Sequence, residues 1–313
     1  MRTVLALLRL IFEGGVITII KLKFIILSDR LLPKPFNNHH EFMRINFTKM
    51  HGLGNDFIVI NSLDNSFDKN LINIIELANR HTGIGFDQLL IVESSSRSEI
   101  DFRYRIFNSD GEEVQQCGNG ARCFALYVFE KKLTKNKKLH VETLNGDIEL
   151  IINNASSVTV NMGKPVFTPS KIPAILDSQC IRCTIDGKEI GVLSMGNPHA
   201  VILAKSIENL EIDKTAKDIQ NSGYFPEGVN VGFMQINSPY SISLRVYERG
   251  VGETQACGTG ACAAVVYGVE NDLLDNTVCV SLPGGDLEIN YEKGSKVFMT
   301  GPAEFVFEGS IEV

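Results

Sequence analysis

The sequence predicts an α+β fold of two pseudo-symmetric lobes. The main observation is a stretch that occurs twice, because residues 105–121 and 245–261 align without a gap. Cys117 and Cys257 fall at the same position in the two copies. In each copy a short β-type run leads into a loop, and Cys-Gly-x-Gly-Ala opens an apolar helix. Many short strands surround this one helix in each half, and that pattern is typical of an α+β architecture.

The chain has 313 residues, of which 44% are hydrophobic and 21% charged, a composition typical of a globular protein of about two domains. The net charge of −7 and the absence of Lys/Arg clusters on any motif argue against nucleic acid as the main partner. The seven cysteines have no dense spacing, unlike a secreted disulfide framework. We therefore expect a reducing compartment and a cytoplasmic location.

Residues 1–42 differ from the rest of the chain. Their apolar runs are interrupted by Arg9, Glu13, Lys21 and Lys23, so none reaches the roughly 18 residues of a membrane span. Three interpretations compete: a membrane or interfacial anchor, a targeting segment, or a start codon assigned too early. We favour the last, because Met43 directly precedes the first well-patterned strand, and we treat residues 1–42 as an N-terminal extension.

The first half predicts strands at 45–49, 57–60, 89–92, 102–107, 141–143, 148–152 and 158–161, with helices at 71–80 and 121–133. A cluster of Pro and Gly over 162–173 marks the crossing between the halves. The second half predicts strands at 180–185, 190–194, 201–203, 231–236, 243–247, 278–282, 287–291, 297–300 and 305–308, with helices at 213–221 and 261–274.

The repeat extends beyond the cysteines. Gly-Asn precedes an apolar run at Asn55 and again at Asn197, and Gln88 matches Asn230 at the start of a later strand. Two copies at a period of about 140 residues indicate a duplicated domain and not a solenoid. A cleft between two such lobes is a usual place for a ligand.

Cys117 and Cys257 each stand just ahead of a helix. Unpaired N–H groups and the helix dipole favour negative charge there, which predicts a thiol pKa below the usual value of about 8.5. Two thiols facing one molecule suit the inversion of a carbon, where a base removes a proton from one face and an acid returns one to the other. Two buried core cysteines are the competing interpretation.

The turns around the thiols carry backbone donors for a carboxylate. These are the N–H groups of Gly118, Asn119, Gly258 and Thr259 at the two helix starts.

Further polar residues stand at matched loop positions, and together they offer amide donors and acceptors to a zwitterion. The pairs are Asn55 with Asn197, Gln88 with Asn230, and Asn108 with Glu248. Arg249 is a candidate to hold a second carboxylate and Glu248 an ammonium. His199 could orient or deprotonate a cysteine, and a loop histidine satisfied by a hydrogen bond is the equal alternative.

Other motifs are weak. We interpret Cys180-Ile-Arg-Cys183 as coincidental and the remaining cysteines as core residues. No zinc-ligand spacing, dinucleotide fingerprint, P-loop or Schiff-base lysine context is present, so we expect no metal and no cofactor. A thiol-based redox or metal-binding module using the C-x-x-C remains the alternative from another class.

Several motifs closely resemble the diaminopimelate epimerase family. They are Phe47-Thr-Lys-Met-His-Gly-Leu-Gly-Asn-Asp-Phe57, Gly85-Phe-Asp-Gln88, Phe107-Asn-Ser-Asp-Gly111, Cys117-Gly-Asn-Gly-Ala-Arg-Cys123, Met195-Gly-Asn-Pro-His199, and Glu248-Arg-Gly250 with Ala256-Cys-Gly-Thr-Gly-Ala-Cys-Ala263. The resemblance covers residues 43–313 and has no counterpart for residues 1–42.

The resemblance implies a cofactor-independent epimerase that interconverts LL- and meso-2,6-diaminopimelate, on the route to lysine and cell-wall precursor. It implies two lobes, each a mostly antiparallel barrel-like sheet around a central helix. The lobes are then residues 43–162 and 163–301, with 302–313 returning to the first. A homodimer is the family expectation. Proline or hydroxyproline racemase is the enzyme alternative.

The resemblance also implies roles for the site residues. Cys117 would donate and Cys257 accept a proton in one direction, with His199 and Glu248 supporting their protonation states. The reacting carboxylate would bind at Gly118, Asn119, Gly258 and Thr259. The rest of the substrate would bind at Asn55, Gln88, Asn108, Asn197, Asn230, Glu248 and Arg249.

Overall fold

The structure, a computed structural model, describes residues 4–13, 16–26, 44–64, 67–68, 72–115, 117–185 and 187–312. The chain forms two compact units, Met1–Met43 and Arg44–Val313. In the first unit, strand β1 (Val4–Glu13) pairs antiparallel with β2 (Val16–Ile26). The rest of the predicted extension, residues 1–3, 14–15 and 27–42, lies outside the described residues. Among the helices described, none has the length and apolarity that crossing a membrane requires.

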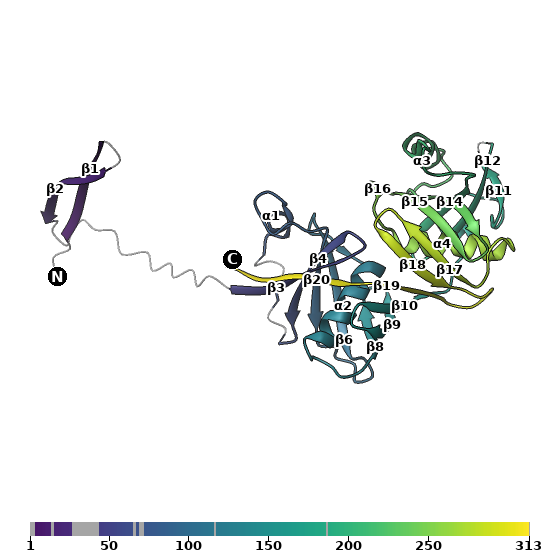
Figure 1. Ribbon diagram of the computed structural model, residues 1–313, viewed down its shortest axis with the longest axis horizontal. Coiled ribbons are helices and arrows are strands. Elements are labelled where there is room, and N and C mark those ends of the chain that lie inside the picture. Colours follow the sequence, from purple (N-terminus) through teal and green to yellow (C-terminus); the bar gives the residue numbers. More distant parts are fainter. Residues whose placement is uncertain are drawn as a thin grey trace. The chain divides into compact units, whose positions relative to one another are not determined.

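The first half of the larger unit is a sheet around one long helix (Figure 1). Its elements are β3 (Arg44–Gly52), β4 (Asn55–Ser62), α1 (Ile74–Ala78), β5 (Gln88–Glu93), β6 (Phe102–Asn108), β7 (Glu113–Val114), α2 (Gly118–Glu130), β8 (Lys138–Thr143), β9 (Gly146–Asn154) and β10 (Ser157–Gly163). The pairings run β3–β4–β5–β6–β8–β9–β10, and only β4–β5 and β6–β8 are parallel. The sheet is therefore mostly antiparallel, as predicted.

The second half repeats this plan. Its elements are β11 (Cys183–Ile185), β12 (Lys188–Ser194), β13 (Pro198–Leu203), α3 (Ile212–Gln220), β14 (Asn230–Ser238), β15 (Ser241–Glu248), β16 (Gly252–Thr254), α4 (Gly258–Glu270), β17 (Thr277–Leu282), β18 (Gly285–Asn290) and β19 (Val297–Pro302). Here β13–β14 and β15–β17 are the parallel pairs. They stand where β4–β5 and β6–β8 stand in the first half, so the duplication seen in the sequence is also a duplication of topology.

Two features join the halves into one closed arrangement of strands. Strand β10 pairs antiparallel with β19, so the last strands of the two repeats lie side by side. After β19 the chain returns to the first half, where β20 (Glu304–Glu312) pairs antiparallel with β3. The first half therefore contains strands from both ends of the larger unit.

The central helices are buried because their sequences are apolar on nearly every face. Residues from Ala121 to Val128 in α2 and from Gly260 to Val269 in α4 are buried without a break. A helix that is apolar all round must lie in a core. One hydrophobic cluster includes both helices, and a second cluster lies around α3 in the second half. The helix starts are thereby fixed by packing, which positions the two cysteines.

The elements differ from the sequence prediction mainly at their ends. Helices α2 and α4 begin three residues earlier than predicted, directly after the cysteines. Helix α1 is shorter than the predicted 71–80, whose first residue lies outside the described residues. The strand predicted over 180–185 is wrong at its start, because only Cys183–Ile185 are extended in β11.

Candidate active site

A cleft of about 1010 Å³ lies between the two halves of the larger unit. It is lined by loops that follow equivalent strands in each half, together with the starts of α2 and α4. Most of the residues predicted for the site line it: Asn55, Gln88, Asn108, Cys117, Gly118, Asn119, Asn197, Glu248, Arg249, Cys257, Gly258 and Thr259. The topology thus brings together side chains that are up to about 200 residues apart in the sequence.

Cys117 is the N-cap residue of α2. Its extended backbone allows its sulfur to accept a hydrogen bond from the Gly120 N–H at 3.3 Å. The Cys117 thiol in turn approaches the Asn55 side-chain oxygen at 3.8 Å. A sulfur that receives an N–H at a helix start is placed where the helix stabilises negative charge.

Cys257 is the N-cap residue of α4 and has different neighbours. Its sulfur lies 3.6 Å from the Thr259 hydroxyl, and the Glu248 carboxylate is near enough to raise the pKa of the thiol. Glu248 accepts a second hydrogen bond from the Thr254 hydroxyl at 2.6 Å. The carboxylate is buried, and burial raises its pKa above the usual value. Cys257 therefore has a potential proton acceptor beside it.

The two cysteine turns touch each other. Asn119, the second residue of α2, donates from its side chain to the Ala256 carbonyl of the other half at 3.4 Å. A Cβ at Gly118 would lie 2.6 Å from the Met299 methyl group, and one at Gly258 would lie 2.9 Å from the Met299 sulfur. Both helix starts therefore pack closely against the end of the Met299 side chain on β19.

The helix starts do not leave the thiol pKa values below the usual value. Burial raises the pKa of the Cys117 thiol to about 11, and the Gly120 N–H and the Arg122 guanidinium only partly offset this. Burial also raises the pKa of Cys257, and the adjacent Glu248 carboxylate raises it further. Both thiols are consequently protonated in the unliganded cleft, because removal from water costs more than the helix start returns.

The amides of the first half form two hydrogen-bonded pairs, one of which leaves an acceptor without a partner among the described residues. Gln88 donates from its side-chain nitrogen to the Asn108 side-chain oxygen at 2.8 Å. Its own side-chain oxygen is buried and has no hydrogen-bond partner among the described residues. The Asn55 oxygen accepts from the Asn119 side chain at 3.3 Å. An unsatisfied acceptor in a cleft is costly without a ligand, so Gln88 is suited to receive an ammonium.

In the second half, two of the predicted residues lie behind the cleft wall. His199 is 1% exposed, and its Nε2 lies 2.9 Å from the Asn197 side-chain oxygen. Burial, aided by the charge of Arg249, lowers the pKa of His199 to about 3. Asn230 is 3% exposed, and it donates to the Pro198 carbonyl and accepts from the Arg249 N–H.

Sequence reasoning missed five charged residues that line the cleft: Arg80, Asp87, Asp110, Glu113 and Glu253. Asp87 accepts a hydrogen bond from the Asn55 side-chain nitrogen at 2.8 Å. Comparison of the two copies could not reveal Asp87, because Val229 stands at its position in the second copy. Likewise, Pro198 stands at the position of Asp56. The signal for Asp56 and Asp87 was that they are sequence neighbours of Asn55 and Gln88. These two predicted site residues stand at the starts of β4 and β5, which pair in parallel.

The interpretation of the C-x-x-C as coincidental is also wrong. Cys180 and Cys183 form a disulfide at the start of β11, in the second half. The Cys180 carbonyl accepts from the Val192 N–H at 2.7 Å, so the bridge fastens the loop to β12. Neither cysteine lines the cleft, whereas Cys117 and Cys257 are free thiols.

Comparison with known proteins agrees with this fold. The family described as diaminopimelate epimerase matches residues 47–168 and 191–306. A diaminopimelate epimerase of Vesicomyosocius okutanii is 51% identical over 271 residues, which are 87% of this chain and 100% of the relative. One from Neisseria meningitidis serogroup A is 53% identical over 277 residues, 85% of this chain and 98% of the relative.

Among solved structures, a hydroxyproline epimerase from Agrobacterium vitis aligns with a TM-score of 0.62 at 12% identity. The alignment covers 86% of this chain and 93% of that one. The fold is therefore the two-lobed α+β class to which such epimerases belong. Within that class, the chain belongs to the diaminopimelate epimerase family.

Proposed function

We propose that this protein interconverts LL- and meso-2,6-diaminopimelate without a cofactor, in the synthesis of lysine and peptidoglycan precursor. The observation that carries the proposal is the pair of N-cap thiols, Cys117 and Cys257, which line one cleft from equivalent turns of a duplicated fold. Membership of the diaminopimelate epimerase family supports the choice of substrate.

The chemistry requires one thiolate and one thiol in each direction. Cys257 in its thiolate form removes the α-proton from one face, and the C–H electron pair moves onto the substrate carboxylate. The Cys117 S–H bond then breaks and its proton is delivered to the opposite face, which leaves Cys117 as the thiolate. The reverse reaction exchanges the roles. Glu248, beside Cys257, is the acceptor that first removes the thiol proton.

Stabilising the carbanion falls to the two helix starts. The N–H groups of Gly118, Asn119, Gly258 and Thr259 bind the reacting carboxylate, where the helix dipoles favour negative charge. The remote amino-acid group of the substrate binds Asn55, Gln88, Asn108, Asn197, Glu248 and Arg249. We assign Asn230 and His199 a positioning role, because both are buried and bond to loops that reach the cleft.

We propose lobes at residues 43–162 and 163–301, with 302–313 belonging to the first and residues 1–42 outside the catalytic unit. The pairing of β20 with β3 supports the return of the C-terminus. The relatives support the exclusion of residues 1–42, since the whole of one relative aligns with 87% of this chain. We propose a cytoplasmic location because the mechanism needs Cys117 and Cys257 reduced, although the Cys180–Cys183 disulfide is unusual in a reducing compartment.

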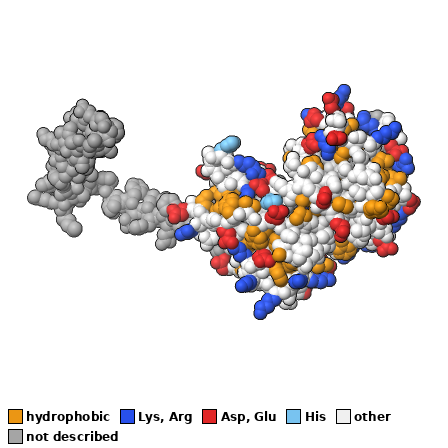
Figure 2. All heavy atoms as spheres, in the orientation of Figure 1, with side chains coloured by type: hydrophobic (Ala, Val, Ile, Leu, Met, Phe, Trp, Pro, Cys, Tyr) orange, Lys and Arg blue, Asp and Glu red, His pale blue; other side chains and the backbone are white. Residues whose placement is uncertain are grey.

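We propose a homodimer formed through β20. Phe305, Val306 and Phe307 are 39%, 53% and 48% exposed on this strand, and Figure 2 shows hydrophobic side chains gathered over the region of β3 and β20. Consecutive exposed apolar residues on a strand mark an association surface. A Phe307→Glu variant should be monomeric by light scattering, and a dimer that persists in this variant would exclude the surface.

The test of function uses reduced protein and LL-diaminopimelate in deuterated water, with no cofactor added. Conversion to the meso form with deuterium at the α-carbon is expected, because a thiol that exchanges with solvent supplies the new proton. Exchange of proline instead would assign the protein to the racemase alternative. No exchange with either substrate would refute the proposal and return attention to redox chemistry at the thiols.

A further inference from the structure

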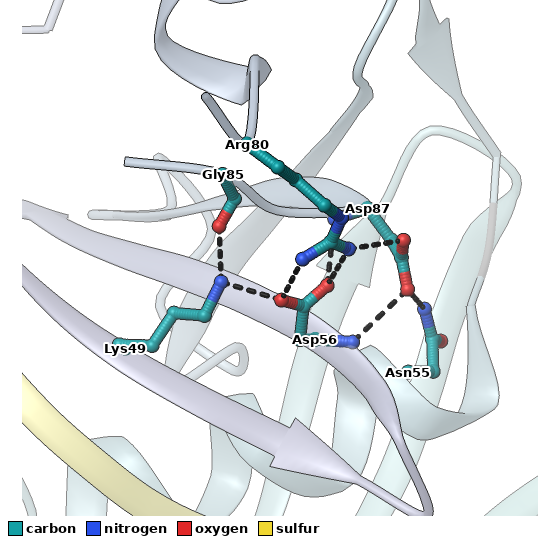
Figure 3. A network of polar contacts seen from close by, with 6 residues as sticks. All are labelled: Lys49, Asn55, Asp56, Arg80, Gly85 and Asp87. Carbon is teal, nitrogen blue, oxygen red and sulfur yellow. Dashed lines mark hydrogen bonds and ion pairs between the residues drawn. The ribbon is translucent and has the colours of Figure 1, made fainter. Parts of the chain in front are cut away.

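Four charged side chains form a compact network at the rim of the cleft (Figure 3). The Lys49 ammonium donates to Asp56 Oδ2 at 2.5 Å and to the Gly85 carbonyl. The Arg80 guanidinium forms two hydrogen bonds with Asp56, at 2.8 and 2.6 Å, and a third with Asp87 Oδ1 at 2.9 Å. Two cations and two carboxylates thus neutralise one another.

The network fixes the position of Asp87. Burial opposes ionisation of Asp56, but the hydrogen bonds from Arg80 and Lys49 outweigh it and lower the pKa of Asp56 to about 2. Asp56 Oδ1 accepts from the Asp87 N–H at 3.0 Å, and Asp87 Oδ2 accepts from the Asp56 N–H at 3.1 Å. This reciprocal pair ties the ends of β4 and β5 together.

Asp87 in turn determines which way the Asn55 amide faces. Its Oδ2 accepts from the Asn55 side-chain nitrogen at 2.8 Å, and an ionised carboxylate can only accept. The nitrogen of Asn55 must therefore point at Asp87. Its oxygen is left to face α2, where it lies 3.8 Å from the Cys117 sulfur and 3.3 Å from the Asn119 side-chain nitrogen.

We infer that Asp87, held by Arg80, is a positioning residue that turns the Asn55 oxygen toward Cys117 and so keeps this thiol as a proton donor. This assignment rests on the proposed function and adds a residue to it. An S–H bonded to an oxygen acceptor favours the thiol, whereas an N–H directed at sulfur favours the thiolate. If the Asn55 amide turned over, Cys117 would lose its acceptor and face an amide donor.

Four other ionisable residues act on the charge of Cys117, and they must stay unchanged in any test. Arg122 of α2 favours the Cys117 thiolate, and Glu248 of the second half opposes it. Tyr104 of β6 and Cys123 of α2 are also within electrostatic range. None of these four residues is changed in the variants proposed here.

The first experiment compares the full-length wild type with Asp87→Asn. An asparagine at 87 can offer its own N–H, so the Asn55 amide is free to turn. We expect turnover of LL-diaminopimelate to fall about tenfold, the value of one hydrogen bond of about 1.4 kcal/mol. The pH midpoint for iodoacetamide labelling of Cys117, read by mass spectrometry of its peptide, should fall by about one unit.

Asp110→Asn is the matched control, because it also removes one carboxylate from the cleft lining. Asp110 accepts from the Glu112 N–H at 2.9 Å, and among the described residues it forms no hydrogen bond with Asn55. We expect turnover within about twofold of wild type and an unchanged labelling midpoint, since Asn55 keeps its orientation. An equal midpoint shift in both variants would attribute the effect to charge alone and overturn the inference.

The second experiment exchanges the two groups. Asn55→Asp alone places two carboxylates face to face and should be nearly inactive. The double variant Asn55→Asp with Asp87→Asn restores a donor at 87 and an acceptor oxygen toward Cys117 without changing the net charge. It should be at least about tenfold more active than Asn55→Asp. No recovery would overturn the inference.

Failure of the inference and failure of the proposed function are distinguishable. The labelling arm needs no substrate, so it decides the orientation of Asn55 even for a protein that does not act on diaminopimelate. Wild-type enzyme without activity would refute the proposed function alone. Normal labelling and normal turnover in Asp87→Asn would refute the inference alone, provided that urea unfolding shows the variant to be folded.

Discussion

The two halves of the molecule hold equivalent asparagines in different ways. Asn55 in the first half is bound at both ends of its amide, its nitrogen by the Asp87 carboxylate and its oxygen by the Asn119 side chain. Asn197 in the second half is bound through its oxygen, by His199. The backbone register is the same, because β4 pairs with β5 as β13 pairs with β14. Duplication has therefore preserved the strand pairing, while the side chains that hydrogen-bond to the asparagine differ between the two halves.

The partner amides differ in the same way. Gln88 lines the cleft and has a free acceptor, whereas Asn230 is buried and uses both ends of its amide within the protein. The longer side chain reaches the ligand space and the shorter one braces two loops. Residues matched by a repeat thus share a backbone position, and their roles depend on what packs around them.

The sharpest test of whether the halves are equivalent in chemistry is to remove one thiol at a time. Cys117→Ala and Cys257→Ala should each reduce epimerisation about a thousandfold or more, because each face of the carbon loses its acid or base. Both variants should unfold at nearly the wild-type urea concentration. Near-normal turnover in either variant would exclude the two-base assignment.

The next test uses acid, because only the second half relies on a buried histidine for its asparagine. The pKa of His199 is about 3 in the folded protein and about 6.5 in the unfolded chain, so the unfolded state binds more protons between these values. The free energy of unfolding should therefore fall as the pH drops from 6.5, by about 3 kcal/mol at pH 4.5.

Urea unfolding at several pH values measures this loss. His199→Gln should lose less stability over the same range, because glutamine does not titrate, while its amide can still donate to Asn197. Exposed His140→Gln is the control and should follow the wild type. A His199→Gln variant as acid-sensitive as wild type would show that this histidine does not govern the loss.

The outer strands of the halves provide a third contrast. Strand β12 is covered by the three-residue β11, beside the Cys180–Cys183 disulfide, whereas β3 is covered by the nine-residue β20. Replacing both cysteines by alanine should lower the free energy of unfolding by about 2 kcal/mol, as expected for a short loop. Activity should be unchanged, since the bridge lies outside the cleft. Lost turnover in a folded variant would contradict this placement.

The smallest expected effect is a shift in the pH midpoint for labelling of the two thiols. Glu248 lies beside Cys257, while Asn108 occupies its position in the first half. Glu248→Gln removes the negative charge that destabilises the Cys257 thiolate, so the labelling midpoint of Cys257 should fall by about one pH unit. The midpoint of Cys117 should fall less. Equal shifts at both thiols would show that Glu248 serves the two halves alike.

The repeat in the sequence was enough to predict the fold class, the two central helices and the gathering of most site residues. It could not predict the thiol pKa values, because burial is set by the packing of α2 and α4 and exceeds the local effect of a helix start. It also could not find Asp87, because the second copy has Val229 there. A comparison of the copies cannot identify a functional residue that only one copy has.

The pairing of β20 with β3 has a consequence for how the protein folds during its synthesis. Arg44 pairs with Glu312, so this edge of the sheet joins the beginning of the catalytic unit to the end of the chain. During synthesis, Ile45 and Phe47 lie on a strand whose partner β20 is absent until the ribosome has synthesised nearly the whole chain. The first half to be translated is therefore the last to be completed, and the nascent chain depends on that final strand.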